Sequence, residues 1–409
     1  MTTSNSSDQA SPTTDWERIE TQLPPDWRQL ADEMRLIRKR PAHMGTKVVD
    51  IGDVLRLVFH RAGTSSSLRK TTAQAHATHI LSISAVALQK WFVKIGPYLA
   101  ALLQRMVGGA AYAAEKWAGF DIIAGDATTV QRPGSKGTTA RVHYALRLAD
   151  LTARHIDVTD EHGGETARRF RAEPGELWLL DRGYSTPPGV VAITQRGGHI
   201  LVRYNRGTLP LFDAKGQRID VLALVRKTRD GGRTQEVPAF VHVGEDHIEG
   251  RLCWIRLPED KAAEARARAQ REANGACDAE TLQAAEFVIV FTSVLKELTA
   301  EQVIELYRVR WQVELEFKRS KSICELDRLP NFRPDTIHSW ICAKLLLKLV
   351  TVRIASQSGG FPPGADNVQV LPTLAPKATD ASRYHRRAVV RHPAGVARRL
   401  RRAVACGAA

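Results

Sequence analysis

Apolar and polar positions alternate through the middle of the chain, as they do in strands with one buried face. The clearest case is 140–151, where Val, Tyr and Leu alternate with His and Arg. Two apolar runs lie within 120–130 and 176–185. Each is predicted to form a short strand that ends in an aspartate. Residues 153–160 read as a further strand, so four strands are expected in this part of the chain.

Helical periodicity appears between and after these strands. A short helix is expected near 165–170, and a second one, opened by a proline, at 187–198. A strand follows at 199–206. The order of three strands, helix, strand, helix, strand predicts a mixed sheet flanked by helices, which is an α/β fold.

Residues 207–286 interrupt this pattern. Short strands are expected at 219–225, 239–244 and 251–257, followed by a charged, Ala-rich helix at 260–273. This pattern predicts a mainly β insertion. A further strand of the core is expected after it, at 288–294.

Two helices are expected after the insertion. The first is long, 298–322, and opens at Thr299 with Gln302 three residues later, as in a capping box. The second is apolar and spans about 338–354. Together with the strand at 288–294 they complete the core that the insertion interrupts.

The N-terminal hundred residues are patterned as helices. A short helix in 71–84 and a second in 84–107 are separated by a break around 82–84. The second helix carries Gln89, Lys90 and Lys94, which would suit a helix-turn-helix that contacts DNA, although most amphipathic helix pairs simply pack together.

Charge and composition narrow the classes of function. The chain has 59 Lys+Arg against 44 Asp+Glu, a net charge of +15 that favours a polyanionic partner such as DNA. Its five cysteines are scattered and form no Cys-x-x-Cys pair, which favours reduced thiols over disulfides or a zinc site. The polar N-terminus does not resemble a signal peptide, and lysines interrupt the best apolar run, so neither secretion nor a membrane span is expected.

Two strands that end in aspartate are the first sign of chemistry. Asp126 and Asp181 each follow an apolar strand, and a carboxylate at a strand end stands at the rim of a sheet, where clefts form. A single such aspartate is ordinary, because turns attract Asp. Two in one sheet indicate a shared metal site.

The long helix after the insertion gives the second sign. A tyrosine, an arginine, a glutamate and a lysine lie on it within about 60° of one another around the axis. They are Tyr307, Arg310, Glu314 and Lys321. Glu316 lies about 200° from Glu314 and points away, so we expect Glu316→Gln to retain most activity. A salt-bridged surface helix would show similar spacings.

These residues resemble the DDE transposases of bacterial insertion sequences, in particular the family called insertion-sequence "four". Its hallmark is Tyr-x2-Arg-x3-Glu-x6-Lys, which the four residues on the long helix match in type and spacing. The family's two aspartate motifs are matched by GDATT at Asp126 and by LLDRGYS at Asp181. The resemblance covers about residues 80–355.

The resemblance implies a ribonuclease H-like catalytic core interrupted by a mainly β insertion. Asp126, Asp181 and Glu314 would be its catalytic residues and would hold two Mg²⁺ ions, replaceable by Mn²⁺, with Asp126 bridging them. The implied activity is cut-and-paste DNA transposition. Water frees a 3′-hydroxyl at the transposon end, this hydroxyl forms a hairpin with the opposite strand, and the reopened end attacks target DNA.

The resemblance also implies the partners and the residues that hold them. The partner would be double-stranded DNA, namely the terminal inverted repeats and the target, bound by a homodimer in the bacterial cytoplasm at the nucleoid. Tyr307, Arg310 and Lys321, with Arg182, would hold phosphates near the cut. Trp254 is the candidate for stacking on a flipped base.

Six segments follow from these patterns. They are a disordered start (1–15), a helical and DNA-binding N-terminal region (16–115), the first part of the core (116–206), the insertion (207–286), the second part of the core (287–356) and a basic tail (357–409). Two alternatives remain open, namely a domesticated protein that binds DNA without cutting it and a nuclease of the same fold without transposition activity.

Overall fold

The structure is a computed structural model that describes residues 15–37, 50–107, 116–228, 232–273, 277–329 and 334–357. The expected disordered start (1–15), apart from Asp15, and the basic tail, apart from Gln357, lie outside these residues. Within the described part, no helix is both long enough and apolar enough to cross a membrane.

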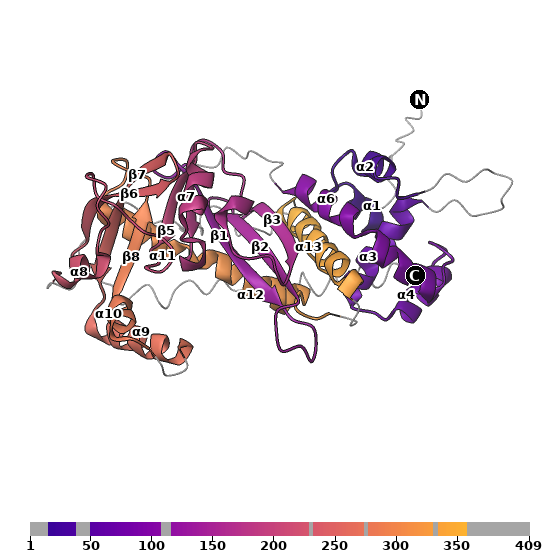
Figure 1. Cartoon of the computed structure of the whole chain (residues 1–409). Coiled ribbons are helices and arrows are strands. Elements are labelled where there is room, and N and C mark those ends of the chain that lie inside the picture. Colours follow the sequence, from indigo (N-terminus) through magenta and orange to yellow (C-terminus); the bar gives the residue numbers. More distant parts are fainter. Residues whose placement is uncertain are drawn as a thin grey trace, which may run out of the picture.

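One eight-stranded sheet forms the centre of the protein (Figure 1). Its spatial order is β3-β2-β1-β4-β5-β8-β7-β6. The strands are β1 (Asp121–Val130), β2 (Ala140–Arg147), β3 (Ala153–Asp160), β4 (Glu176–Leu180), β5 (His199–Arg203), β6 (Gln235–Val243), β7 (Asp246–Arg256) and β8 (Phe287–Thr292). β1 to β3 are antiparallel neighbours, β4 and β5 run parallel to β1, and β8 returns antiparallel to β5. The α/β class is therefore confirmed, and this order fits a ribonuclease H-like core.

Successive side chains along each strand point to opposite faces of the sheet, and an apolar core lies on each face. Ile122, Leu177 and Leu201 face a core shared with the N-terminal helices and the helices after β8. Their neighbours in sequence, such as Ile123 and Trp178, face a second core shared with α7 (Pro187–Thr194) and the insertion. The central strands β1, β4 and β5 are thus buried on both sides.

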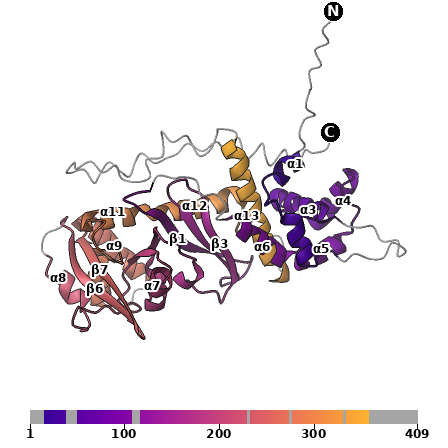
Figure 2. The same cartoon turned by 90° about the horizontal axis from the view of Figure 1, so that it is seen from above.

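Three helices after β8 cover the first of these faces. They are α11 (Ala300–Val309), α12 (Trp311–Cys324) and α13 (Pro334–Gln357). The expected single helix 298–322 is thus divided at Arg310, while the capping box of Thr299 and Gln302 is confirmed. α13 lies between the sheet and the N-terminal helices, where it packs on β3, α3, α5 and α6 (Figure 2).

The N-terminal region is helical, as expected. Its helices are α1 (Asp15–Glu20), α2 (Trp27–Glu33), α3 (Ile51–Thr64), α4 (Leu68–Ala77), α5 (Ala85–Lys94) and α6 (Gly96–Met106). The hydroxyls of Ser67 and Ser84 cap the first turns of α4 and α5. The break expected around 82–84 is therefore real, and α4 packs against α5.

The insertion differs from the expectation in two respects. The apolar run 219–225 is not a strand: Asp220 caps α8 (Val221–Arg226) by accepting a hydrogen bond from the Ala223 backbone. The hairpin β6–β7 joins the central sheet through β8 and is accompanied by α9 (Glu259–Glu272) and α10 (Ala279–Ala285). The segment is therefore mixed α and β, and it extends the core sheet.

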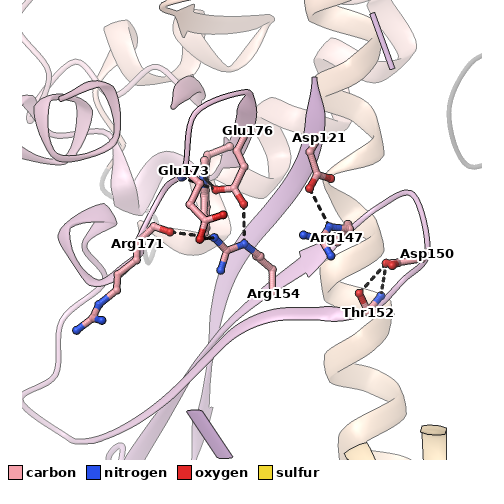
Figure 3. A network of polar contacts seen from close by, with 9 residues as sticks. Asp121, Arg147, Asp150, Thr152, Arg154, Arg171, Glu173 and Glu176 are labelled. Atoms are coloured by element: carbon pink, nitrogen blue, oxygen red, sulfur yellow. Dashed lines mark hydrogen bonds and ion pairs between the residues drawn. The ribbon is translucent and has the colours of Figure 1, made fainter. Parts of the chain in front are cut away.

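A polar network ties together the amino ends of β1 and β4 (Figure 3). Asp121 accepts a hydrogen bond from Arg147 at 2.8 Å, and Glu176 accepts one from Arg154 at 2.6 Å. Arg154 belongs to β3, and Glu176 starts β4, so this ion pair joins strands that have two others between them.

Candidate active site

Asp126 and Asp181 come together because β1 and β4 are parallel neighbours. Gly125 pairs with Leu180 in the register, so the residue after each lies at the same level of the sheet. Strand alternation turns both carboxylates to the face covered by α11 and α12. Asp181 directly follows β4 as expected, whereas β1 continues beyond Asp126 to Val130 because it stays paired with β2.

Arg310, at the junction of α11 and α12, joins the three carboxylates. Its guanidinium nitrogens lie 3.3 Å from Asp126 Oδ2, 3.8 Å from Asp181 Oδ2 and 2.7 Å from Glu314 Oε1. The Arg310 side chain is 11% exposed, against 38% for Asp181 and 48% for Glu314. One buried cation is therefore shared by three acids, and the cluster opens to solvent on the side of Asp181 and Glu314.

Tyr307 supports this cluster from the last turn of α11. Its hydroxyl donates a hydrogen bond to Asp181 Oδ1 at 3.1 Å, and its ring is buried. Tyr307, Arg310 and Glu314 thus face the two aspartates together, as the helical spacing predicts, even though the helix is divided at Arg310.

Burial and charge act differently on the two aspartates. Burial raises the pKa of Asp126 to about 6, although Arg310 opposes this shift. Burial would also raise the pKa of Asp181, but Arg310, a backbone hydrogen bond from Arg182 and the charge of Arg203 together lower it. Asp181 is therefore the more acidic of the two.

The three carboxylates fit a divalent metal by the chemistry of their donor atoms. Carboxylate oxygens are the hard ligands that Mg²⁺ and Mn²⁺ prefer. In the described part of the chain, no three acidic, histidine or cysteine side chains are grouped closely enough to hold one ion. Arg310 explains this, because its guanidinium lies among the three acids and takes the place of a cationic partner.

Two further cations, Arg182 and Arg203, border the cluster, and a third, Lys321, lies farther along α12. Lys321 is half-buried on α12, two turns beyond Glu314, and Arg182 is exposed directly after Asp181. Arg203, which the sequence analysis missed, ends β5 beside Asp181, and its charge lowers the pKa of that aspartate. The sequence shows only that a basic residue ends this strand, and not that the strand lies next to β4.

The two tryptophans of this region differ in exposure. Trp254, the sequence candidate for base stacking, is 2% exposed in β7, and its indole N–H donates to Thr228 at 2.8 Å. This packing leaves the ring no free face for a base. Trp311 is 39% exposed and follows Arg310 directly, so the accessible aromatic surface lies on α12.

Glu316 points away from the aspartates, as the helical arithmetic predicts. It is 8% exposed and forms ion pairs with Arg319 and with Lys348 of α13. The prediction that Glu316→Gln retains most activity stays a prediction, and the substitution would also remove one charge of a buried pair.

The chain is similar to bacterial transposases over most of its length. The family described as "Transposase DDE domain" matches residues 117–348, a range that contains all three carboxylates. A transposase for insertion sequence element IS421 of Escherichia coli is 30% identical over 328 residues, which cover 78% of this chain and 88% of the relative. The transposase InsL of element IS186A of Escherichia coli K12 is 29% identical with the same coverage. A transposase for element IS231F of Bacillus thuringiensis subsp. israelensis is 22% identical over 376 residues, which cover 81% of this chain and 77% of the relative.

Proposed function

The chain belongs to the DDE transposases of bacterial insertion sequences, and from this premise we propose that it moves its element by a cut-and-paste reaction with Asp126, Asp181 and Glu314 as catalytic residues. The observation that carries the proposal is the convergence of these three carboxylates, from β1, the end of β4 and α12, on Arg310.

The three carboxylates would hold two Mg²⁺ ions, for which Mn²⁺ can substitute. When bound, such ions activate an attacking oxygen and stabilise a leaving one. The acids would orient the attacking oxygen, first that of water and then the 3′-hydroxyl of the cut strand. In each step one P–O bond forms as another breaks, so neither ATP nor a covalent protein intermediate is required.

The cations around the cluster would hold the DNA backbone. A planar guanidinium such as that of Arg310 suits a phosphate as well as it suits carboxylates. Arg182 and Arg203 border the same site and Lys321 lies farther along α12, and their charges would offset those of phosphates on either side of the cut. With Tyr307, they would hold the terminal strand while it folds into a hairpin.

A base displaced from the terminal pair needs an aromatic partner, and we assign this role to Trp311. Its ring is exposed beside Arg310, whereas that of Trp254 is buried. Stacking on an aromatic ring contributes about 1–3 kcal/mol per base. Trp311→Ala should therefore lower hairpin formation more than the first nick.

The second helix of the α4–α5 pair is the proposed reader of the transposon end. Val86, Gln89, Lys90 and Val93 follow helical spacing along α5, and the two valines are 67% and 40% exposed. The amide nitrogen of Gln89 is buried, so the exposed groups of this face are the cation of Lys90 and the two valines, which suit the edges of bases in a major groove. Lys94 is not part of this face, because its ammonium is bonded to the Leu36 carbonyl and lies over Trp91.

The remaining partners follow from the reaction. Two transposon ends must be joined for cut-and-paste movement, so we propose a homodimer in the complex that holds them. The substrate is double-stranded DNA of the bacterial chromosome, which places the activity at the nucleoid in the cytoplasm.

One assay tests the function against its alternatives. The protein is incubated with Mg²⁺ and labelled DNA that carries the inverted repeats flanking its own gene, together with a target plasmid. We expect nicked, hairpin and transferred products. Nicks without transfer would indicate a nuclease of the same fold, and binding without nicks would indicate a domesticated DNA-binding protein.

A further inference from the structure

The face of α12 that packs into the protein carries few apolar side chains. Its buried residues are Val313, Glu316, Phe317 and Ser320. Because apolar burial is non-directional, two apolar side chains on a 14-residue helix specify its rotation about the axis only weakly. A directional contact is needed to fix which residues of α12 face the sheet.

Lys348 of α13 makes such a contact at two points. Its ammonium forms an ion pair with the Glu316 carboxylate and donates to Ser320 Oγ at 3.0 Å. The side chains of Lys348 and Glu316 are 9% and 10% exposed. The same ammonium lies 4.7 Å from the centre of the Tyr144 ring on β2. Lys348 therefore links α12, α13 and the sheet.

Two of the residues that Lys348 contacts lie next to residues of the candidate active site. Tyr144 is the direct cross-strand partner of Asp126, so both side chains stand on the same face of the sheet. Glu316 follows Glu314 by two residues and lies about 200° from it around α12. Holding Glu316 against Lys348 therefore turns Glu314 toward the aspartates.

We propose that Lys348 is a positioning residue, which fixes the rotation of α12 through Glu316 and Ser320 and thereby sets the place of Glu314. The proposal rests on the proposed role of Glu314 as a metal ligand. A buried ion pair often gives no more stability than apolar residues of similar size. The contribution of Lys348 and Glu316 is therefore to the geometry of the site.

The test replaces both charges in the full-length protein by Glu316→Met together with Lys348→Met. We expect a thermal midpoint close to that of the parent, and an Mn²⁺ dissociation constant raised at least about tenfold, the range found when a residue that orients a metal ligand is lost. Mn²⁺ binding is measured by electron paramagnetic resonance on folded protein. A folded double variant with parental Mn²⁺ affinity would overturn the proposal.

The matched control is a buried ion pair within the sheet, Arg154 with Glu176. These side chains are 11% and 5% exposed and lie at the amino ends of the strands (Figure 3). Arg154→Met together with Glu176→Gln should leave Mn²⁺ affinity unchanged. An equal loss of Mn²⁺ affinity in this control would show that loss of a buried ion pair anywhere in the protein weakens metal binding. That result would also overturn a specific role for Lys348.

Two single variants keep the result decisive. If the double Met variant does not fold, Glu316→Asp retains the charge but shortens the side chain, so it should still weaken Mn²⁺ binding severalfold. Lys348→Arg, which keeps the charge and the reach of the side chain, should largely retain the parental affinity. Parental affinity in Glu316→Asp would overturn the proposal. Glu314→Gln serves as the reference, since unchanged Mn²⁺ affinity there means that the proposed ligand role of Glu314 fails.

Discussion

Strand β1 carries two carboxylates, and β4 begins with one and is followed directly by another. The two ends of this strand pair hold these groups differently. At the amino ends, Asp121 and Glu176 pair in the register (Figure 3). Asp121 pairs with Arg147, and Glu176 pairs with Arg154, which also pairs with the exposed Glu173. Glu176 also accepts hydrogen bonds from the Trp178 indole and the Glu173 backbone. Each of the two strand carboxylates there is thus paired with a different arginine.

The other end of the same strands carries an excess of negative charge. Asp126 and Asp181 share Arg310 with a third acid, Glu314, and two of the three acids are more than one-third exposed. The same residue types on the same two strands thus give a closed structural network at one end and an unbalanced, open cluster at the other. The unbalanced end is the one suited to bind cations.

The largest expected effect is on DNA cleavage, and it should follow from substitutions at the carboxyl ends of β1 and β4 and not at their amino ends. Asp126→Asn, Asp181→Asn and Glu314→Gln should each lower cleavage of labelled transposon ends at least about a thousandfold, because a bound metal stabilises the transition state by several kcal/mol. Binding to the same DNA should persist, since phosphate contacts elsewhere supply most of the affinity. A variant that cuts at near the parental rate would remove that residue from the catalytic set.

The second expected effect is on the free energy of unfolding, and it should follow from substitution at the amino ends of β1 and β4. Glu176→Gln removes one partner of a buried ion pair and should lower the free energy of unfolding by about 3 kcal/mol. Cleavage per folded molecule should stay parental. Chemical denaturation measures the first quantity and single-turnover cleavage the second. Loss of cleavage in fully folded Glu176→Gln would mean that the two ends are not independent.

The helical face of the candidate site could be predicted from the sequence because it depends on local geometry. The positions of Tyr307, Arg310 and Glu314 relative to one another follow from residue spacing, and the placement of Asp126 beside Asp181 follows from two apolar strands in one sheet. The structure brings all five together. The orientation of Glu316 followed from the same arithmetic.

Features that depend on contacts distant in sequence could not be predicted in this way. The pairing of Glu316 with Lys348 and the burial of Trp254 depend on which elements pack on each face of the sheet. The run 219–225 is too short for periodicity to separate strand from helix, and the cap at Asp220 decided it. Arg203 lies at the site because β5 is parallel to β4, a pairing that its own sequence does not reveal.

A smaller effect is the pH dependence of stability in the absence of metal. The pKa of Asp126 is about 6 in the folded protein, above its ordinary value of 3.8. Its contribution to stability is therefore complete below about pH 4 and is lost as pH rises through 6, at up to about 1.4 kcal/mol per pH unit. Asp126→Asn cannot ionise, so its stability relative to the parent should rise between pH 4 and 6 and level off above.

Denaturation in EDTA at intervals of half a pH unit measures this difference. Buried His143, whose pKa is lowered by burial to about 4, acts in the opposite direction but is present in both proteins, so it cancels. A difference between variant and parent that does not change with pH would show that Asp126 does not titrate in this range.

The smallest effect concerns one hydrogen bond at the open end. Tyr307→Phe removes the bond to Asp181 and keeps the buried ring, so cleavage should fall only about tenfold, as expected for a single hydrogen bond to a charged group. The hairpin step should lose more than the first nick, because the proposed role of Tyr307 is to hold the terminal strand while it folds back. Nicked and hairpin products are measured separately on labelled ends. Equal losses at both steps would limit Tyr307 to orienting Asp181, and an unchanged rate at both would remove it from the site.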